Sequence, residues 1–217
     1  MRVILKPVGV ICVVTAFLLL TWLAVRQSSK GKDEGGATIA AKTVGADKIA
    51  PTPGAAILNG GFEDKYAPAV PFSAEGKVTG LIAEPWADDS SWAPVTVNYS
   101  QDSERPHAGK SCQKVEVSDV AAGKDARVQF VQEINLPVNQ LHRVSCWIRA
   151  DRTTEIDIAL RQKLWPYTYY GVNKVTIGNN WKKIEVSGTP SIGGTTFVML
   201  KISKPVTFWV DDAQVTK

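Results

Sequence analysis

Residues that catalytic and redox sites commonly use are scarce in this chain of 217 residues, which has two histidines, three cysteines and two methionines. Both His107 and His142 fall near predicted turns, and neither belongs to a recognisable Ser-His-Asp arrangement or metal-hydrolase spacing. The acidic residues are scattered over turns and strand ends, which disfavours a two-carboxylate glycosidase. We therefore expect a protein that is not an enzyme.

Long runs of lysine and arginine are missing from the part of the chain expected to fold, although the net charge is +4. Much of the basic excess lies close to the N-terminus, at Arg2, Lys6, Arg26, Lys30 and Lys32. Without a basic stripe on the folded part, the composition gives little support to nucleic-acid binding.

The longest apolar run is Val8 to Val25, whose 18 residues reach the lower end of what spans a bilayer. The run ends in Ala24-Val25-Arg26-Gln27, a poor cleavage site, so we favour a retained single-pass anchor over residues 1–26. A cleaved signal is the alternative and would make the protein secreted. Residues 27–54 lack aromatics and apolar periodicity and are interpreted as a flexible linker. We expect a membrane-anchored domain outside the cytoplasm.

Residues 55–217 lack a convincing helical period and an internal repeat, and instead show short alternating segments between turn residues. The clearest segment runs from Arg143 to Ala150, with Val144, Cys146 and Ile148 on one face. About nine strands are expected, at residues 95–99, 111–117, 127–134, 143–150, 155–161, 174–177, 181–186, 195–202 and 207–215, whereas residues 66–83 are interpreted as a loop. The predicted fold is an all-β, two-sheet β-sandwich, most simply a jelly roll.

Two cysteines, Cys112 and Cys146, lie in predicted strands. In an exported domain they could form a disulfide, and two buried free thiols are the alternative. Spacing alone does not decide between the two states, because it does not place the Cα atoms.

The last predicted strand contains two adjacent carboxylates, Asp211 and Asp212, within an otherwise apolar run. A buried carboxylate without a partner is costly, so these groups need cations, hydrogen-bond donors or water. One interpretation is a strand end that is open to solvent. The other is a Ca²⁺ site, since this ion binds carboxylates together with main-chain carbonyls.

An ordered set of elements resembles the carbohydrate-binding modules of the family 4/9/22 type over about 160 residues. The elements are Asn59-Gly-Gly-Phe-Glu63, His107-Ala-Gly-Lys-Ser111, Gln129 to Gln132 before Leu136-Pro137, Val144 to Ala150, Trp181, and Phe208-Trp-Val-Asp-Asp212. The resemblance implies a structural Ca²⁺ ion held by the carboxylates of Glu63 and Asp211 and by main-chain carbonyls near Gly61 and Lys110. Such modules are commonly joined to glycoside hydrolases, so a hydrolase is a possible partner.

A sugar-binding face needs flat rings for the C–H faces of the sugar and planar polar groups for its hydroxyls. Trp147 and Arg149 leave their strand opposite its apolar residues, and Asp157 and Arg161 do so on the next strand, where a plain surface pair between them is the alternative. The resemblance adds Gln129 and Gln132. The remaining candidate contacts are Trp92, Trp165, Tyr167 and Tyr169.

Not every tryptophan is expected at that face. Trp181 and Trp209 are predicted to lie in the core, because strand tryptophans are more often buried. Trp86 and Trp92 either plug a loop against the sandwich or touch the ligand.

These observations predict non-catalytic binding of a polysaccharide or glycan. The alternative is a structural or protein-interaction sandwich without a sugar site. An open groove over Gln129 and Trp147 would favour binding, and filled space there would favour the alternative.

Overall fold

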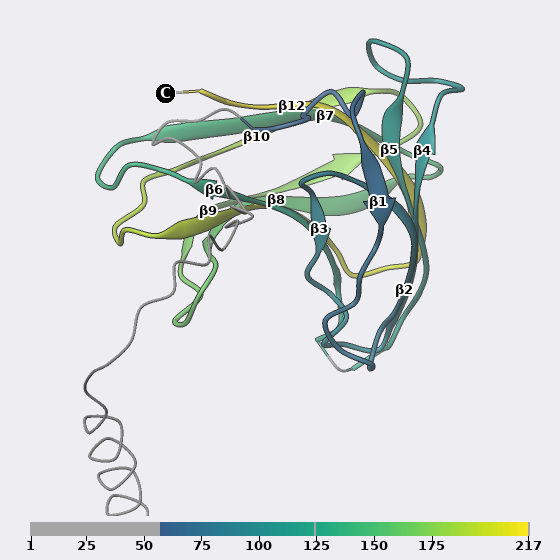
Figure 1. The fold of residues 1–217 in the computed structure, drawn as a ribbon, viewed down its shortest axis with the longest axis horizontal. Helices are drawn as coiled ribbons and strands as arrows, with labels where there is room; N and C mark the ends of the chain where they lie inside the picture. The colour runs from purple at the N-terminus through teal and green to yellow at the C-terminus, as the bar shows by residue number, and fades with distance from the viewer. Residues whose placement is uncertain (1–56, 124, 217) are drawn as a thin grey trace, which may run out of the picture. The chain divides into compact units, whose positions relative to one another are not determined.

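The computed structural model describes residues 57–123 and 125–216, which form an all-β sandwich of two sheets (Figure 1). The predicted anchor at 1–26 and linker at 27–54 lie outside the described residues. Within the described residues, no helix has the length and apolar character needed to cross a membrane.

The larger sheet has seven strands, and the smaller one has five. The larger sheet has the order β1 (Tyr66–Pro68), β2 (Lys77–Ala83), β4 (Val95–Asp102), β5 (Cys112–Val120), β12 (Val206–Thr216), β7 (His142–Ala150) and β10 (Lys182–Gly188). The smaller sheet has the order β3 (Ala87–Asp88), β6 (Val128–Asn135), β11 (Thr195–Ile202), β8 (Thr154–Gln162) and β9 (Tyr169–Ile177).

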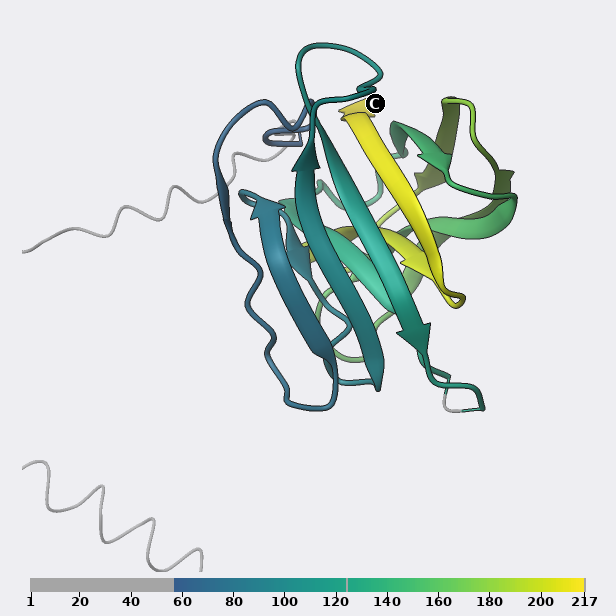
Figure 2. The ribbon, with the colours of Figure 1, turned by 90° about the vertical axis from the view of Figure 1, so that its right-hand side faces the viewer.

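The larger sheet bends around one end of the smaller sheet. In Figure 1 it runs from β10, β7 and β12 along the top to β5, β4 and β2 on the right. Figure 2 shows β2, β4, β5 and β12 side by side. In the larger sheet, neighbouring strands are antiparallel, except that β2 and β4 are parallel.

The nine predicted strands are confirmed, with shifted ends, but the prediction of a loop at residues 66–83 is wrong. That segment contains β1 and β2, and β3 follows shortly after it. Strand β2 shows no regular alternation of buried and exposed residues, and Gly80 has φ of +91°. A glycine in that conformation and a missing period of two are signals of a loop, so the sequence pattern was misleading here.

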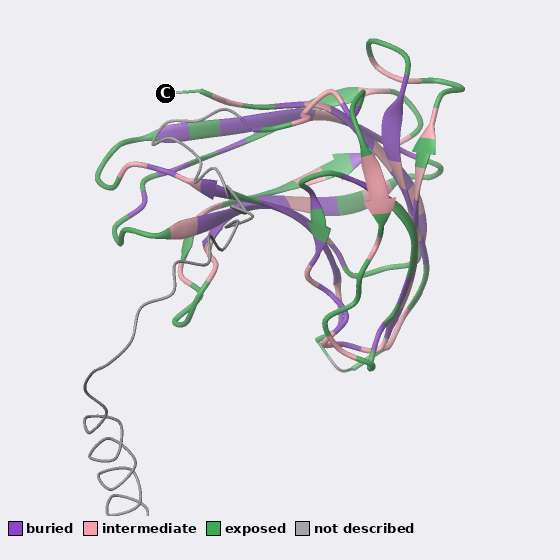
Figure 3. Ribbon diagram, in the orientation of Figure 1, coloured by how far each residue is buried: buried purple, intermediate pink, exposed green. Residues whose placement is uncertain are grey.

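The core lies between the sheets, where alternate residues of facing strands meet (Figure 3). In β7, Val144, Cys146, Ile148 and Ala150 are all buried, as the alternation predicted. Trp86 also belongs to the core, because it stacks on Phe130 at a centroid distance of 4.6 Å. Of the two interpretations of Trp86, the one that packs it against the sandwich is therefore confirmed.

Cys112 and Cys146 are free, buried thiols. They lie on β5 and β7, and β12 runs between these two strands. Burial raises the pKa of each thiol to about 12, which keeps both protonated. The disulfide considered from the sequence is not formed.

Candidate functional site

The predicted ligand face is divided between two sheets. Trp147 and Arg149 lie on β7 of the larger sheet, whereas Gln129 and Arg161 lie on β6 and β8 of the smaller sheet. Alternation correctly placed Trp147 on the face opposite the apolar residues of its strand. It does not say which sheet a strand joins, and consecutive strands of a sandwich often change sheets. The prediction that one face contains both groups is therefore wrong.

A pocket of about 410 Å³ lies over the outer face of the smaller sheet. Beneath that face lies a small apolar cluster of Val131, Ala159, Phe197 and Met199, separate from the main core. The pocket is lined by Phe72, Asp89, Trp92, Arg127, Gln129, Arg161, Lys163, Leu164, Tyr167 and Phe197. Four of the predicted ligand contacts, Trp92, Gln129, Arg161 and Tyr167, are thus brought together.

Arg161 lies across the pocket and is only 8% exposed. Its Nη2 donates to Oδ2 of Asp89 (2.8 Å), and its Nη1 donates to Oε1 of Gln129 (3.4 Å). The considered pair with Asp157 is not formed, because Asp157 pairs with Lys201 (2.8 Å), its direct neighbour across the strands. Because both of its partners, Asp89 and Gln129, line the pocket, the guanidinium of Arg161 lies at the pocket, as a ligand contact requires.

The loop after β3 forms one wall of the pocket. The main-chain N–H of Asp89 donates to the carbonyl of Gln129 (2.9 Å), and Nε2 of Gln129 donates back to the carbonyl of Asp89 (2.8 Å). Nε1 of Trp92 donates to the same carbonyl (2.9 Å). Burial raises the pKa of Asp89, and the charge of Arg161 opposes that shift. Asp89 and Trp92 are thereby held at fixed positions.

The opposite wall is the hairpin between β8 and β9. Tyr167 has φ of +59°, an uncommon conformation for a bulky residue, and its N–H donates to the carbonyl of Leu164 (2.8 Å). Trp165 is 80% exposed and does not line the pocket. Tyr169 lies outside the lining too, with its ring 5.6 Å from Nζ of Lys201. These two rings can touch only a ligand that extends beyond the pocket.

Gln132 does not face the pocket. Its side chain is 1% exposed, accepts from the N–H of Leu58 (2.8 Å) and donates to the carbonyl of Leu58 (2.8 Å). It shares the parity of Phe130 and Ile134, which face the main core. The predicted ligand role of Gln132 is therefore wrong. Its side chain has a structural role, because it joins Leu58 at the start of the domain to β6.

Replacing Gln132 with alanine is expected to lower the free energy of unfolding by about 2 kcal/mol, because two main-chain groups of Leu58 lose their partners. Urea denaturation would measure the change, with Gln140→Ala, at an exposed turn position, as the control. Affinity at the pocket should stay the same. A large loss of affinity at unchanged stability would contradict this assignment.

The outer face of the larger sheet carries a second aromatic group. The guanidinium of Arg149 lies between the rings of Trp209 (3.7 Å) and Trp181 (5.2 Å) and is 6% exposed. Trp181 and Trp209 are only half-buried on this outer face, so their predicted place in the core is wrong. The inward positions of Phe208 and Val210 already required Trp209 to point outward.

Trp147 is covered by a neighbouring ring. The imidazole of His107 stacks on it at a centroid distance of 3.9 Å. The space over Trp147 is therefore filled, whereas a pocket lies over Gln129. Of the two faces, the smaller sheet carries the stronger candidate site.

The predicted metal ligands meet at the loop of residues 107–111. Oε1 of Glu63 accepts from the N–H groups of Lys110 (2.6 Å) and Ser111 (3.0 Å). Oδ2 of Asp211 accepts from the N–H groups of His107 (2.9 Å) and Ala108 (3.2 Å). The N-terminal turn containing Gly61 and the last strand are thus joined through one loop.

The donor set at this loop is small for a calcium ion. In the described part of the chain, no group of three or more His, Cys, Asp or Glu side chains is arranged to hold a metal. Burial raises the pKa of Asp211 to about 6, and the main-chain N–H groups that donate to this carboxylate oppose the shift. Two carboxylates with main-chain carbonyls match the kind of oxygen that calcium prefers, and the remaining ligands would have to be further carbonyls or water.

Comparison with solved structures shows what the sandwich is similar to. A family 4 module described as "CBM4 structure and function" matches with a TM-score of 0.54 and 18% identity, over 73% of this chain and 97% of that one. The fold resembles that of carbohydrate-binding modules. Other structural neighbours are modules of families 22, 16 and 61. They include TmCBM61 in complex with β-1,4-galactotriose, with a TM-score of 0.47 and 17% identity over 74% of this chain and 97% of that one.

Not every structural neighbour is a carbohydrate-binding module. The enzymatically active domain of a bacteriophage CBA120 tailspike matches with a TM-score of 0.45 and 14% identity, over 73% of this chain and 21% of that one. No known family profile and no curated protein matches the sequence.

Proposed function

We propose that this domain binds a glycan in the pocket of the smaller sheet and does not alter it chemically. The observation that carries the proposal is the combination of flat rings with fixed planar polar groups around one pocket. Trp92, Phe72 and Tyr167 supply the rings, and Gln129 and Arg161 supply an amide and a guanidinium. The likeness to a family 4 carbohydrate-binding module supports the same function.

The polar groups of the pocket are held in place before a ligand arrives. Gln129 bonds to Asp89 through its side chain and its main chain, and Asp89 bonds to Arg161. Side chains that are already ordered lose less conformational entropy when a ligand binds. Such preorganisation suits sugars, whose hydroxyls form many individually weak hydrogen bonds.

Affinity electrophoresis of the full chain in mild detergent tests this function against β-glucans, xylans, mannans and galactans, including acidic members of each class. Retardation by at least one glycan, with a folded sample, is the expected result. No retardation by any of them would overturn the proposal and favour the structural or protein-interaction alternative.

We also propose that residues 8–25 anchor the domain at a membrane with the pocket outside the cytoplasm. The support is the apolar run itself, which lies outside the described residues. Membrane pellets should retain the protein after carbonate extraction, and protease that reaches the extracytoplasmic side of the membrane should cleave it. A glycoside hydrolase remains the proposed partner in that compartment.

Calcium is expected to stabilise the domain if it binds at Glu63 and Asp211. A cation there would compensate the buried charge of Asp211, and at about 100 times its dissociation constant it would raise Tm by about 5–10 °C. Differential scanning fluorimetry with calcium and with a chelator measures the shift. Glu63→Gln and Asp211→Asn should abolish it, whereas Glu75→Gln, at an exposed position, should not. Equal Tm values with and without calcium would contradict the site.

A further inference from the structure

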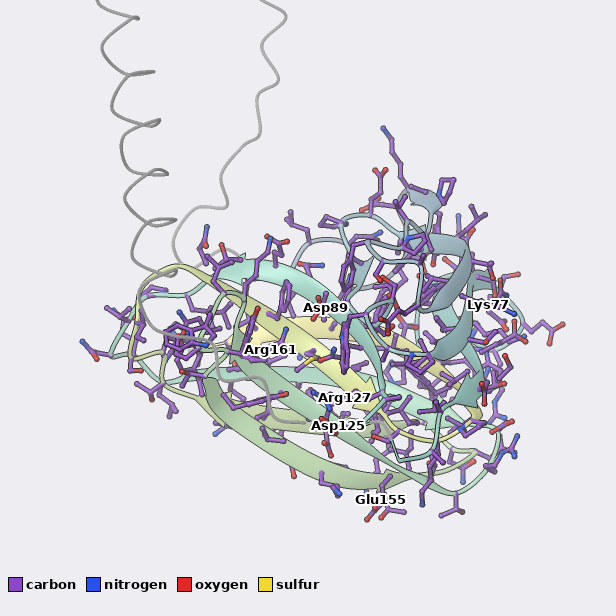
Figure 4. All side chains as sticks on the ribbon, turned by 90° about the horizontal axis from the view of Figure 1, so that it is seen from below. Lys77, Asp89, Asp125, Arg127, Glu155 and Arg161 are labelled. Carbon is purple, nitrogen blue, oxygen red and sulfur yellow. The ribbon has the colours of Figure 1, made fainter. Side chains whose placement is uncertain are left out.

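The side chains around the pocket carry an excess of positive charge. The lining contains three cations, Arg127, Arg161 and Lys163, and one carboxylate, Asp89. Asp89 is already engaged by Arg161 at 2.8 Å. Figure 4 shows Arg161, Arg127 and Asp89 on the face that is seen from below. A neutral sugar needs no such excess, because its hydroxyls donate and accept equally well.

The carboxylates that pair with the other two cations lie towards solvent rather than in the lining. Asp125, the partner of Arg127, is 87% exposed, and Glu133, the partner of Lys163, is 51% exposed. Exposed ion pairs contribute little because water screens them. A ligand anion inside the pocket would interact with the same cations in a less polar environment, where the attraction is stronger.

Both guanidinium groups have hydrogen-bonding capacity that the protein does not use. Among the described residues, the buried Nε–H of Arg161 and that of Arg127 have no hydrogen-bond partner. Arg161 donates only through its two Nη atoms, and Arg127 through Nη1. A buried donor without a partner is unfavourable, and a guanidinium fork matches the two oxygens of an oxyanion.

A second basic region adjoins the pocket on the same sheet. Lys201 is the cross-strand partner of Gln129, and with Lys174 and Lys204 it lines a smaller pocket of about 150 Å³. That pocket also contains Glu155 and Asp157, so three cations face two carboxylates. Lys201 is paired with Asp157 (2.8 Å) and Lys174 lies 3.9 Å from Glu155, so the excess in this second pocket is a single positive charge.

We propose that the ligand of this pocket is an acidic glycan, whose sugar oxyanion is bound by Arg127, Arg161 and Lys163. The proposal rests on the proposed glycan-binding function and names its substrate class. A uronate carboxylate and a sugar sulfate share the required chemistry. One charge-assisted contact contributes about 1.5–3 kcal/mol, so removing the anion should lower affinity about 10- to 100-fold.

The test compares each acidic glycan with its own neutral form. Isothermal titration calorimetry of the full chain in detergent would use oligogalacturonate against its carboxyl-reduced form, and a sulfated galactan oligomer against its desulfated form. The expected result is at least tenfold tighter binding of one acidic form, with the advantage falling as salt rises. Whichever pair shows the difference identifies the carboxylate or the sulfate as the anion.

Failure of this proposal is distinguishable from failure of the proposed function. Equal affinity for the acidic and neutral forms would overturn the acidic preference and leave glycan binding intact. Binding of neither form, together with no retardation by any glycan in electrophoresis, would overturn both.

Two pocket variants and one matched control locate the effect. Arg127→Gln and Lys163→Gln leave the Arg161–Asp89 pair intact, and each should reduce the preference for the acidic form at least threefold. Lys77→Gln makes the same change of charge on β2, away from the labelled pocket residues in Figure 4, and should leave the preference unchanged. An equal loss in Lys77→Gln would overturn the proposal, because net charge rather than the pocket would then explain binding. Unchanged urea midpoints confirm that the variants fold.

Discussion

Replacing Tyr167 with glycine is expected to abolish most of the glycan affinity while leaving the stability of the domain nearly unchanged. Tyr167 lines the pocket and has φ of +59°. A non-glycine residue in the left-handed region costs about 1–2 kcal/mol, and glycine adopts it freely. The greater entropy of glycine in the unfolded chain offsets about half of that gain, so the free energy of unfolding should change by less than about 1 kcal/mol.

The affinity should fall because the ring is lost. Burying an aromatic side chain against a ligand is worth about 1.5–3 kcal/mol, which corresponds to a loss of about 10- to 100-fold in Kd. Calorimetry with a short oligosaccharide measures the affinity, and urea denaturation measures the stability. An uncommon backbone conformation at a pocket-lining ring is the kind of strain that binding sites retain.

Two further variants separate the ring from the flexibility of the hairpin. Tyr167→Asn also removes the ring, but asparagine tolerates positive φ without the freedom of glycine. It should therefore lose as much affinity as the glycine variant. Trp165→Ala should leave the affinity for a short oligosaccharide within twofold, because this ring lies outside the pocket. Normal binding by Tyr167→Asn would show that the hairpin, and not the ring, determines affinity.

Alternation along the strands predicted which side chains face inward, and it did so correctly for β7 and β12. Cys146 and Phe208 are buried, while Trp147 and Trp209 point outward. Trp209 was nevertheless predicted to lie in the core, because tryptophans in strands are more often buried than exposed. A period of two follows from backbone geometry, whereas the tendency of tryptophan to be buried is only an average, so the period was the better guide.

The assignment of strands to sheets could not be predicted from the period. Trp147 and Arg161 are on consecutive strands, yet β7 and β8 belong to different sheets. That choice depends on long-range pairing, here β7 with β12 and β8 with β11, which a local pattern does not contain. The predicted site was therefore half correct, because Gln129 and Arg161 meet at the pocket and Trp147 and Arg149 do not.

Two of the missed pocket residues illustrate the same limit. Phe197 lies in the predicted strand 195–202, for which no ligand-facing side was predicted, and Asp89 lies between Trp86 and Trp92, outside the nine predicted strands. Phe197 is the cross-strand partner of Arg161, and Asp89 reaches Arg161 from 72 positions away in the chain. Their common location follows from the pairing of β3, β6, β11 and β8, so a sequence signal could at most have marked Asp89 as an acid beside a ring, Trp92.

Replacing Asp88 with alanine is expected to destabilise the domain by about 3–5 kcal/mol and also to weaken glycan binding, although Asp88 does not line the pocket. The buried Asp88 carboxylate accepts from the hydroxyl of Tyr99 (2.7 Å) and from the N–H (2.9 Å) and hydroxyl of Ser90. Burial raises the pKa of Tyr99 well above its usual value, so its hydroxyl remains a donor. Removing the carboxylate leaves these buried donors without an acceptor.

A double-mutant cycle with Tyr99→Phe separates the two consequences of this loss. Tyr99→Phe alone removes one donor and leaves Asp88 bonded to Ser90, so the free energy of unfolding should fall by about 1–2 kcal/mol. Urea denaturation of the two single variants and the double variant should show a coupling energy of similar size. Because Asp88 directly precedes Asp89, its loss should also release the wall that holds Trp92, and affinity should fall in Asp88→Ala but not in Tyr99→Phe. Equal affinity in both variants would mean that the two hydrogen bonds between Asp89 and Gln129 hold the wall without help from Asp88.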